Sequence, residues 1–97
     1  MIYELLNEGA QNARTAKELC IQLGIDEKDW REVTKAIERE RRDGKPICAS
    51  SSSDSPGYYK PANRKELEHY INKLRRRAGE IFKTRRALQK VLEGMEA

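Results

Sequence analysis

The 97-residue sequence predicts a mainly α-helical protein with a small β-hairpin and a long C-terminal helix. Three features predict this class. Short amphipathic segments in the first half begin at capping residues and end at glycines, which is typical of helices. After Pro46 the apolar residues change from helical spacing to alternation. From Leu67 onward, apolar residues recur at alternating spacings of four and three, as in one long helix.

The first two helices are expected before residue 25. The opening segment places its apolar residues on one helical stripe and ends at Gly9, which predicts a first helix. That stripe consists of Ile2, Leu5 and Leu6. A second helix is expected to start at the capping box Thr15–Glu18, where the hydroxyl accepts from a first-turn N–H and the glutamate reaches back. It should end at Gly24. Its apolar face is predicted to comprise Ala16, Leu19, Cys20 and Leu23.

A third helix is predicted to end at Gly44, because Pro46 prevents its continuation. Asp29–Glu32 repeats the capping pattern with aspartate as the cap, although the sequence also allows a start at Asp26. The inward face is expected to hold Trp30, Val33 and Ile37. This register favours a core position for the tryptophan over a stacking platform for single-stranded nucleic acid.

The hairpin is predicted between residues 47 and 61. In the first strand, Ile47 and Ala49 face one way, and Cys48 and Ser50 face the other. The second strand is aromatic and ends at Pro61, with one of Tyr58 and Tyr59 expected in the core. The connecting sequence SSSDSPG contains turn formers and no large apolar group, so an exposed tip is expected. The sequence also allows a short third strand near Ala13.

A capping pattern at Asn63–Glu66 predicts the start of the final helix. In a heptad frame the d positions hold Leu67, Leu74, Ile81, Leu88 and Met95, and the a positions hold Ile71, Ala78, Arg85 and Leu92. The chain is therefore expected to contain one domain at residues 1–61 and a coiled-coil-like amphipathic helix at residues 62–97.

The length of the final helix predicts a homodimer. A helix of about 30 residues is about 45 Å long, whereas a 60-residue domain is about 27 Å across. The second half of the helix should extend beyond its own domain, where an exposed apolar stripe would be unfavourable, so a second copy is expected to cover it. The dimer contacts are predicted to come from Leu74, Ala78, Ile81, Arg85, Leu88 and Leu92.

The composition makes other classes of protein poor candidates. No secretory signal or apolar membrane-spanning run is present, so a cytoplasmic protein without membrane contact is expected. Cys20, Cys48 and His69 do not make a convincing metal site, and both cysteines are expected to be buried. No catalytic set or phosphate-binding loop can be assembled. A non-enzymatic protein without a cofactor or small-molecule substrate is therefore predicted.

The charge is distributed unevenly between the two parts of the chain. Residues 1–63 contain ten Lys or Arg against eleven Asp or Glu, a balance of −1, whereas residues 64–97 contain ten against five, a balance of +5. The basic residues of the final helix surround it without forming one stripe. They are equally consistent with a solvated helix exterior and with phosphate binding.

The segments TAKELCIQLGI, REVTKAIERERRDGKPI and GYY resemble winged helix-turn-helix domains of bacterial regulators, such as the DNA-binding domain of the biotin repressor. They also resemble small winged-helix proteins of phages and mobile elements. The matching positions are Leu19, Leu23, Gly24, Val33, Ile37, Gly44, Ile47, Gly57 and Tyr58. Two positions depart from that family: Glu40 stands where a leucine is common, and Asp54 and serines stand where many wings carry Arg or Lys.

The resemblance implies that the third helix enters the major groove of double-stranded DNA. With Trp30, Val33 and Ile37 inward, the outward residues are Arg31, Thr34, Lys35 and Glu38. Arginine can pair with guanine, threonine can contact a thymine methyl group, and glutamate can accept from cytosine. Phosphate contacts are expected from Lys17, Lys28, Arg39 and Arg42. The prediction is a sequence-specific regulator or replication accessory. The alternative is a protein–protein interaction adaptor that does not bind DNA.

Overall fold

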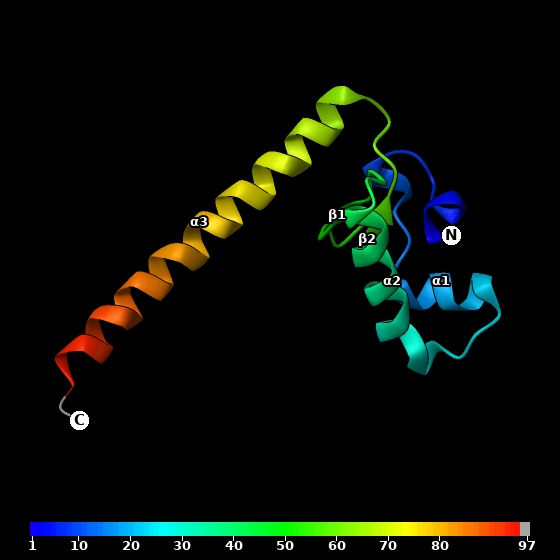
Figure 1. The fold of residues 1–97 in the computed structure, drawn as a ribbon. Coiled ribbons are helices and arrows are strands. Elements are labelled where there is room, and N and C mark those ends of the chain that lie inside the picture. The colour runs from blue at the N-terminus through cyan, green and yellow to red at the C-terminus, as the bar shows by residue number, and fades with distance from the viewer. Residues whose placement is uncertain (96–97) are drawn as a thin grey trace. The chain divides into compact units, whose positions relative to one another are not determined.

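Two short α-helices, a β-hairpin and one long α-helix follow one another along the chain (Figure 1). In the computed structural model, which describes residues 1–95, they are α1 (Ala16–Leu23), α2 (Trp30–Arg42), β1 (Cys48–Ser50), β2 (Gly57–Tyr59) and α3 (Arg64–Gly94). The predicted class, mainly helical with a small hairpin and a long C-terminal helix, is confirmed. The chain forms two compact units, Met1–Leu67 and Glu68–Ala97.

The predicted first α-helix is wrong. Two short 3₁₀ turns, Ile2–Leu5 and Ala10–Asn12, occupy that part of the chain. The segment between them pairs with the end of the hairpin, because the amide of Lys60 donates to Asn7 O at 2.8 Å and the amide of Gly9 donates to Lys60 O at 2.9 Å. These tertiary bonds require extended backbone where a helix would have continued, and such a short helix is marginal by itself.

The prediction for α1 is confirmed at both ends. Thr15 Oγ1 accepts from the amide of Glu18 at 3.1 Å, and the Glu18 carboxylate accepts from the amide of Thr15 at 3.1 Å. Gly24 ends the helix in the left-handed conformation, with φ +73°. Leu19 and Cys20 are fully buried, but Leu23 is 43% exposed and its predicted core position is wrong. It is the last residue of an eight-residue helix, so only the middle of α1 is covered.

α2 starts directly after Asp29, one of the two starts that the sequence allowed, but without the expected side-chain cap. Asp26 caps a 3₁₀ turn, Glu27–Asp29, by accepting from the amide of Lys28 at 3.0 Å, and Asp29 makes no side-chain capping bond. Val33 and Ile37 are buried as predicted. The predicted core position of Trp30 is wrong, because its side chain is 37% exposed. Trp30 shares the side of α2 that carries Ile37 but lies two turns earlier, at the first residue of the helix.

The hairpin pairs Cys48 with Tyr59, Ala49 with Tyr58 and Ser50 with Gly57 in antiparallel register. Tyr59 is buried and Tyr58 is half-buried. Near Ala13, where the sequence allowed a third strand, Arg14 makes an isolated β-bridge: its amide donates to Tyr58 O at 2.9 Å, and the amide of Tyr58 donates back to Arg14 O at 2.7 Å. The predicted alternation in β1 is only partial, because Ile47 and Cys48 are both buried.

The core of the first unit joins the N-terminal turn, both short helices and the start of the hairpin. It consists of Ile2, Leu6, Leu19, Cys20, Val33, Ile37 and Ile47. The Glu40 carboxylate lies beside this core and accepts from the amides of Ile2 and Tyr3, both at 2.9 Å. Glu40 therefore binds the N-terminal turn to α2.

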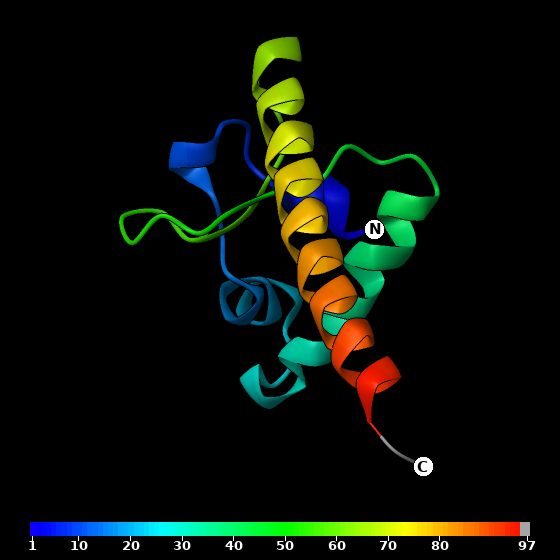
Figure 2. The same cartoon turned by 90° about the vertical axis from the view of Figure 1, so that its left-hand side faces the viewer.

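Asn63 caps α3 as predicted, because its Oδ1 accepts from the amide of Glu66 at 2.9 Å. The Glu66 carboxylate accepts from the amides of Ala62 at 2.9 Å and Ala10 at 3.3 Å, which fixes the first turn of α3 to the first unit. From Ile71 to Gly94 every side chain of α3 is exposed. Figure 2 shows α3 as one continuous helix. Within residues 1–95, no helix is both long enough and apolar enough to cross a membrane.

Candidate nucleic-acid interface

The surface of α2 opposite its buried residues carries a row of cations. Val33 and Ile37 fix the inward side, and helical spacing then places Arg31, Lys35 and Arg42 within about 40° of one another on the outward side. All three are exposed. This outward row extends over 11 residue steps, about 16 Å. It contains Arg31 and Lys35 of the predicted base-reading set and Arg42 of the predicted phosphate-binding set.

Arg31 is held over an exposed aromatic ring. Its guanidinium carbon lies 5.3 Å from the centroid of the Trp30 ring. Such a contact stabilises an exposed pair by about 0.5–1 kcal/mol and limits where the arginine can point. The cost of ordering Arg31 on a ligand is correspondingly lower.

The other predicted base-reading residues already have intramolecular partners. The hydroxyl of the half-buried Thr34 donates to Arg31 O at 2.7 Å. Lys35 Nζ lies 3.5 Å from a Glu32 oxygen, with both side chains well exposed. The Glu38 carboxylate accepts from Arg41 at 2.8 Å. Exposed ion pairs of this kind are weak, so Lys35 is readily released. Glu38 is less free to move, because its partner Arg41 is itself held in place by other contacts.

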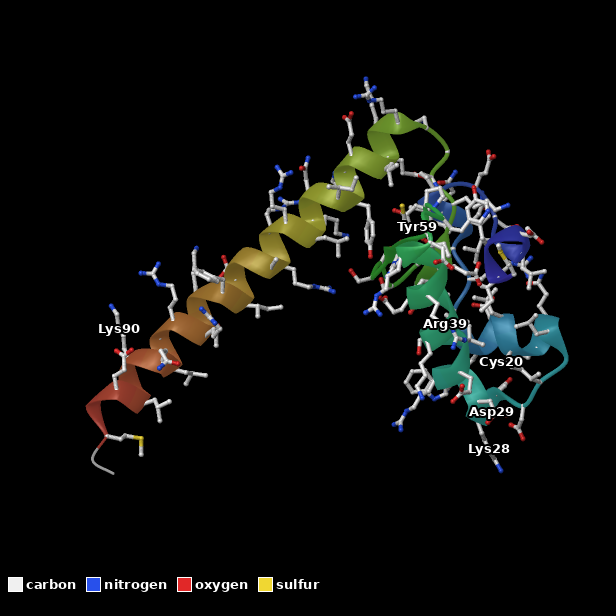
Figure 3. All side chains as sticks on the ribbon, in the orientation of Figure 1. Cys20, Lys28, Asp29, Arg39, Tyr59 and Lys90 are labelled. Carbon is white, nitrogen blue, oxygen red and sulfur yellow. The ribbon has the colours of Figure 1, made fainter. Side chains whose placement is uncertain are left out.

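The residues predicted to contact phosphate are all exposed, but they come from different elements. Lys17 lies on α1, Lys28 on the turn before α2, and Arg39 and Arg42 on the second half of α2. Figure 3 shows Lys28 extending away from the fold at the start of α2. Only Arg39 and Arg42 are brought close to one another by the helix.

The electrostatic character of α2 changes along its length. Residues 26–32 contain four acids (Asp26, Glu27, Asp29 and Glu32) and two bases (Lys28 and Arg31), a balance of −2. Residues 35–45 contain five bases and three acids, a balance of +2, and one of those acids, Glu40, bonds to the N-terminal turn. The attraction for an anionic polymer is therefore strongest at the C-terminal half of α2 and is centred on Arg39 and Arg42.

The hairpin tip offers hydroxyl groups and no cation. Ser50 Oγ accepts from the amide of Ser52 at 3.2 Å, and Ser52 Oγ accepts from the amide of Asp54 at 3.3 Å. Residues 51–54 are exposed, and the tip projects as a loop in Figure 2. Hydroxyl and amide donors can bond to phosphate, but this tip adds no net attraction.

The two cysteine thiols are unsuited to act as nucleophiles. Burial raises the pKa of the Cys20 thiol above its ordinary value of 9.0, and the nearby carboxylates of Asp29, Glu27 and Asp26 raise it further. Burial likewise raises the pKa of Cys48, and Glu66 adds to the effect. Both thiols are free and stay protonated at neutral pH. Among residues 1–95, no group of three or more His, Cys, Asp or Glu side chains could hold a metal ion.

Arg41 is a structural cation that the sequence did not identify. Its Nε donates to Ile47 O at 2.9 Å, and its guanidinium carbon lies 5.8 Å from the centroid of the Tyr58 ring. It therefore connects α2 to β2 and to the residue that precedes β1. Its place beside the other bases, Arg39 and Arg42, gave no signal for this role. The side of α2 that it shares with Ile37, four residues earlier, is the feature that could have indicated it.

The apolar residues of α3 form an exposed row along the second unit. The residues predicted to make dimer contacts are all on it and all exposed: Leu74, Ala78, Ile81, Arg85, Leu88 and Leu92. The exposed fraction is 41% for Leu74 and between 62% and 64% for Ile81, Leu88 and Leu92. The Arg85 guanidinium carbon lies 5.3 Å from the centroid of the Phe82 ring, to one side of this row.

Comparison with known protein families, curated proteins and solved structures gives no match.

Proposed function

We propose that this chain is a sequence-specific double-stranded DNA-binding protein of the winged helix-turn-helix class, acting as a small regulator or a replication accessory of a phage or mobile element. The observation that carries the proposal is the outward row Arg31, Lys35 and Arg42 on α2, directly opposite the buried Val33 and Ile37. A helix whose far side is fixed in a core can present such a row to the major groove, which is about 12 Å wide.

Arg31 is the proposed base-reading residue. It lies in the first turn of α2, the part of a recognition helix that contacts base edges, and the Trp30 ring limits its motion. Bidentate pairing with a guanine is the contact that its geometry favours. The acids at residues 26–29 repel phosphate, so the DNA backbone should approach the C-terminal half of α2, where Arg39 and Arg42 can bind it.

The exposed row on α3 supports a homodimer. A monomer would leave five leucine or isoleucine side chains more than two-fifths exposed along one side of α3, and such a contiguous apolar patch is typical of a protein interface. A dimer on DNA would bind half-sites related by two-fold symmetry. A palindromic target is therefore part of the proposal.

A protein–protein interaction adaptor is the second candidate. Its supporting observation is a group of exposed apolar residues in the first unit, close together in sequence at the end of α1 and the start of α2: Ile21, Leu23, Ile25 and Trp30. The hairpin tip without cations agrees with this reading. The two candidates differ in their dependence on salt, because only DNA binding releases condensed counterions.

The experiment selects bound sequences from random duplex DNA and then measures affinity for the selected site by gel shift at several salt concentrations. We expect a palindromic site whose affinity falls steeply with salt. Arg31→Ala should weaken binding by about 1–3 kcal/mol and relax one base preference. The matched variant Arg42→Ala should weaken binding equally on all sequences and lower the salt slope by about 1.

Two results would contradict the proposal. Absence of duplex binding at low salt would favour the adaptor. An unchanged site preference in Arg31→Ala, beside intact binding, would show that another residue reads the bases.

A further inference from the structure

The α3 seam is the exposed row that a second copy would cover. It comprises Ile71, Leu74, Ala78, Ile81, Arg85, Leu88 and Leu92. Ile81, Thr84, Arg85 and Leu88 line a shallow groove with mostly apolar walls. Residues at this spacing form the four-sided hole that receives one side chain of the facing helix in a coiled coil. The groove is therefore a place where one side chain of a second helix could insert.

The charge of α3 does not prevent pairing with another copy. Residues 64–97 hold ten Lys or Arg, and helical spacing places six of them on the sides of α3 away from the seam. These six are Lys65, Lys73, Arg76, Lys83, Arg86 and Lys90. Lys83 has an acidic partner on the same helix, with Nζ 3.4 Å from a Glu80 oxygen. These six cations therefore lie on the water-facing sides of a two-helix assembly.

A parallel pair fits the seam poorly. In a parallel coiled coil each a residue faces its own copy, so two Arg85 side chains would share one layer beside the groove. Like charges in one desolvated layer are unfavourable. In the layer seven residues before Arg85, two Ala78 side chains would face each other and leave a space the size of several methylene groups unfilled. Such a gap is costly in a packed interface.

An antiparallel pair removes both defects, because each a residue then faces a d residue of the second copy. The register centred between Gly79 and Glu80 also keeps the two Arg85 residues about 16 Å apart along the axis, whereas the next register toward the C-terminus brings them within about 6 Å. With the two-fold axis between Gly79 and Glu80, each Arg85 faces Leu74 of the second copy, and each Ala78 faces Ile81. Ile71 faces Leu88 in the next layer out. A small residue then meets a large one, and the Arg85 guanidinium can remain beside Phe82 while Leu74 covers its aliphatic stem.

We infer that the chain forms a homodimer through an antiparallel pairing of α3, centred between Gly79 and Glu80. This inference rests on the dimer in the proposed function and gives it an orientation. Helical rise then places the two Leu67 residues about 38 Å apart along the helix axis. In a parallel dimer both would lie at the same end. The first units are therefore attached at opposite ends of the helix pair.

The test uses single cysteines on the seam, because both native thiols are buried. Ile71→Cys and Leu88→Cys proteins are mixed and oxidised mildly, and each is also oxidised alone. We expect disulfide dimers to be about tenfold more abundant in the mixture than in either protein alone, since the antiparallel layer brings residue 71 beside residue 88. Lys90→Cys, on the outer side, should not cross-link and is the matched control.

A distance measurement covers the case in which seam substitutions weaken the dimer. Spin labels on Lys90→Cys leave the seam intact, and the antiparallel pairing predicts a separation of about 38 Å, against about 20 Å for a parallel one. The orientation would be refuted if the protein sediments as a dimer but the spin labels lie at the shorter distance, or if Leu88→Cys cross-links to itself. Either result would leave the proposed homodimer standing. A monomer at high micromolar concentration would refute the homodimer itself.

Discussion

Replacing Glu40 by leucine tests the contact between α2 and the N-terminal turn. The carboxylate accepts two backbone N–H groups, from Ile2 and Tyr3, both at 2.9 Å. Leucine has nearly the same helix propensity, so the change isolates the loss of these acceptors. If Glu40 merely occupied an apolar position, leucine would stabilise the unit. The structure predicts the opposite.

The magnitude follows from the two bonds. A hydrogen bond to a charged group contributes about 1.5–3 kcal/mol, and water can replace part of the loss because Glu40 is only half-buried. We expect the free energy of unfolding to fall by about 2–3 kcal/mol. With a slope of about 1 kcal/mol per M for a unit of this size, the urea midpoint should fall by about 2–3 M. Glu40→Gln keeps one acceptor and should lose about half as much.

The assay is urea unfolding followed by the fluorescence of Trp30, the only tryptophan, which lies in the first unit and reports on it without a contribution from α3. Glu32→Leu is the matched control, because this exposed carboxylate has only a weak pairing with Lys35; it should change stability by less than about 0.5 kcal/mol. Equal losses in the Glu32 and Glu40 variants, or a raised midpoint in Glu40→Leu, would refute the capping role.

Two further predictions concern the first unit. Gly57→Ala should lower the free energy of unfolding by about 2–5 kcal/mol, because φ is +119° and an added Cβ would overlap Arg14 O. Gly44→Ala is the control, because Gly44 has φ +98° but lies in open space, so only backbone strain should lower its stability. Equal losses of stability in the two variants would contradict the overlap. Cys20 and Cys48 should react with a thiol reagent about a hundredfold more slowly in the folded chain than in the unfolded chain. Burial raises both pKa values above 9.0, so the unfolded chain loses these protons first, and the urea midpoint should fall between about pH 8 and pH 10; rapid labelling of the folded chain would contradict this.

The sequence predicted those parts of the fold that depend on neighbouring residues. The capping box at Thr15, the left-handed Gly24 and the cap at Asn63 are local hydrogen-bonding patterns, and all three are confirmed. The prediction of a first α-helix was wrong because Asn7 and Gly9 form backbone hydrogen bonds with Lys60, which is far along the chain. The predicted core position of Trp30 was wrong for a related reason. Helical spacing gives the side of the helix on which a residue lies, but only tertiary structure determines how far along the helix the core extends.

The candidate interface was predictable to the same extent. Val33 and Ile37 fixed the outward row of α2, and its cations are exposed as expected. The contacts of Glu38 and Arg41 could not be derived, since Arg41 is oriented by Ile47 O and the Tyr58 ring, which belong to the hairpin. The α3 seam was visible in the heptad, and the groove at Ile81 and Leu88 adds the shape that a repeat cannot supply.

The reciprocal backbone pairing of Arg14 with Tyr58 has a consequence for how the first unit folds. It closes a loop that contains α1, α2 and β1, so this bridge cannot form until residues 14 and 58, at the two ends of that loop, have been brought together. Contacts between such distant positions slow folding, because the entropy of closing the loop is lost before the contacts form. A circularly permuted chain that is cut inside this loop should therefore fold at a different rate to the same final structure.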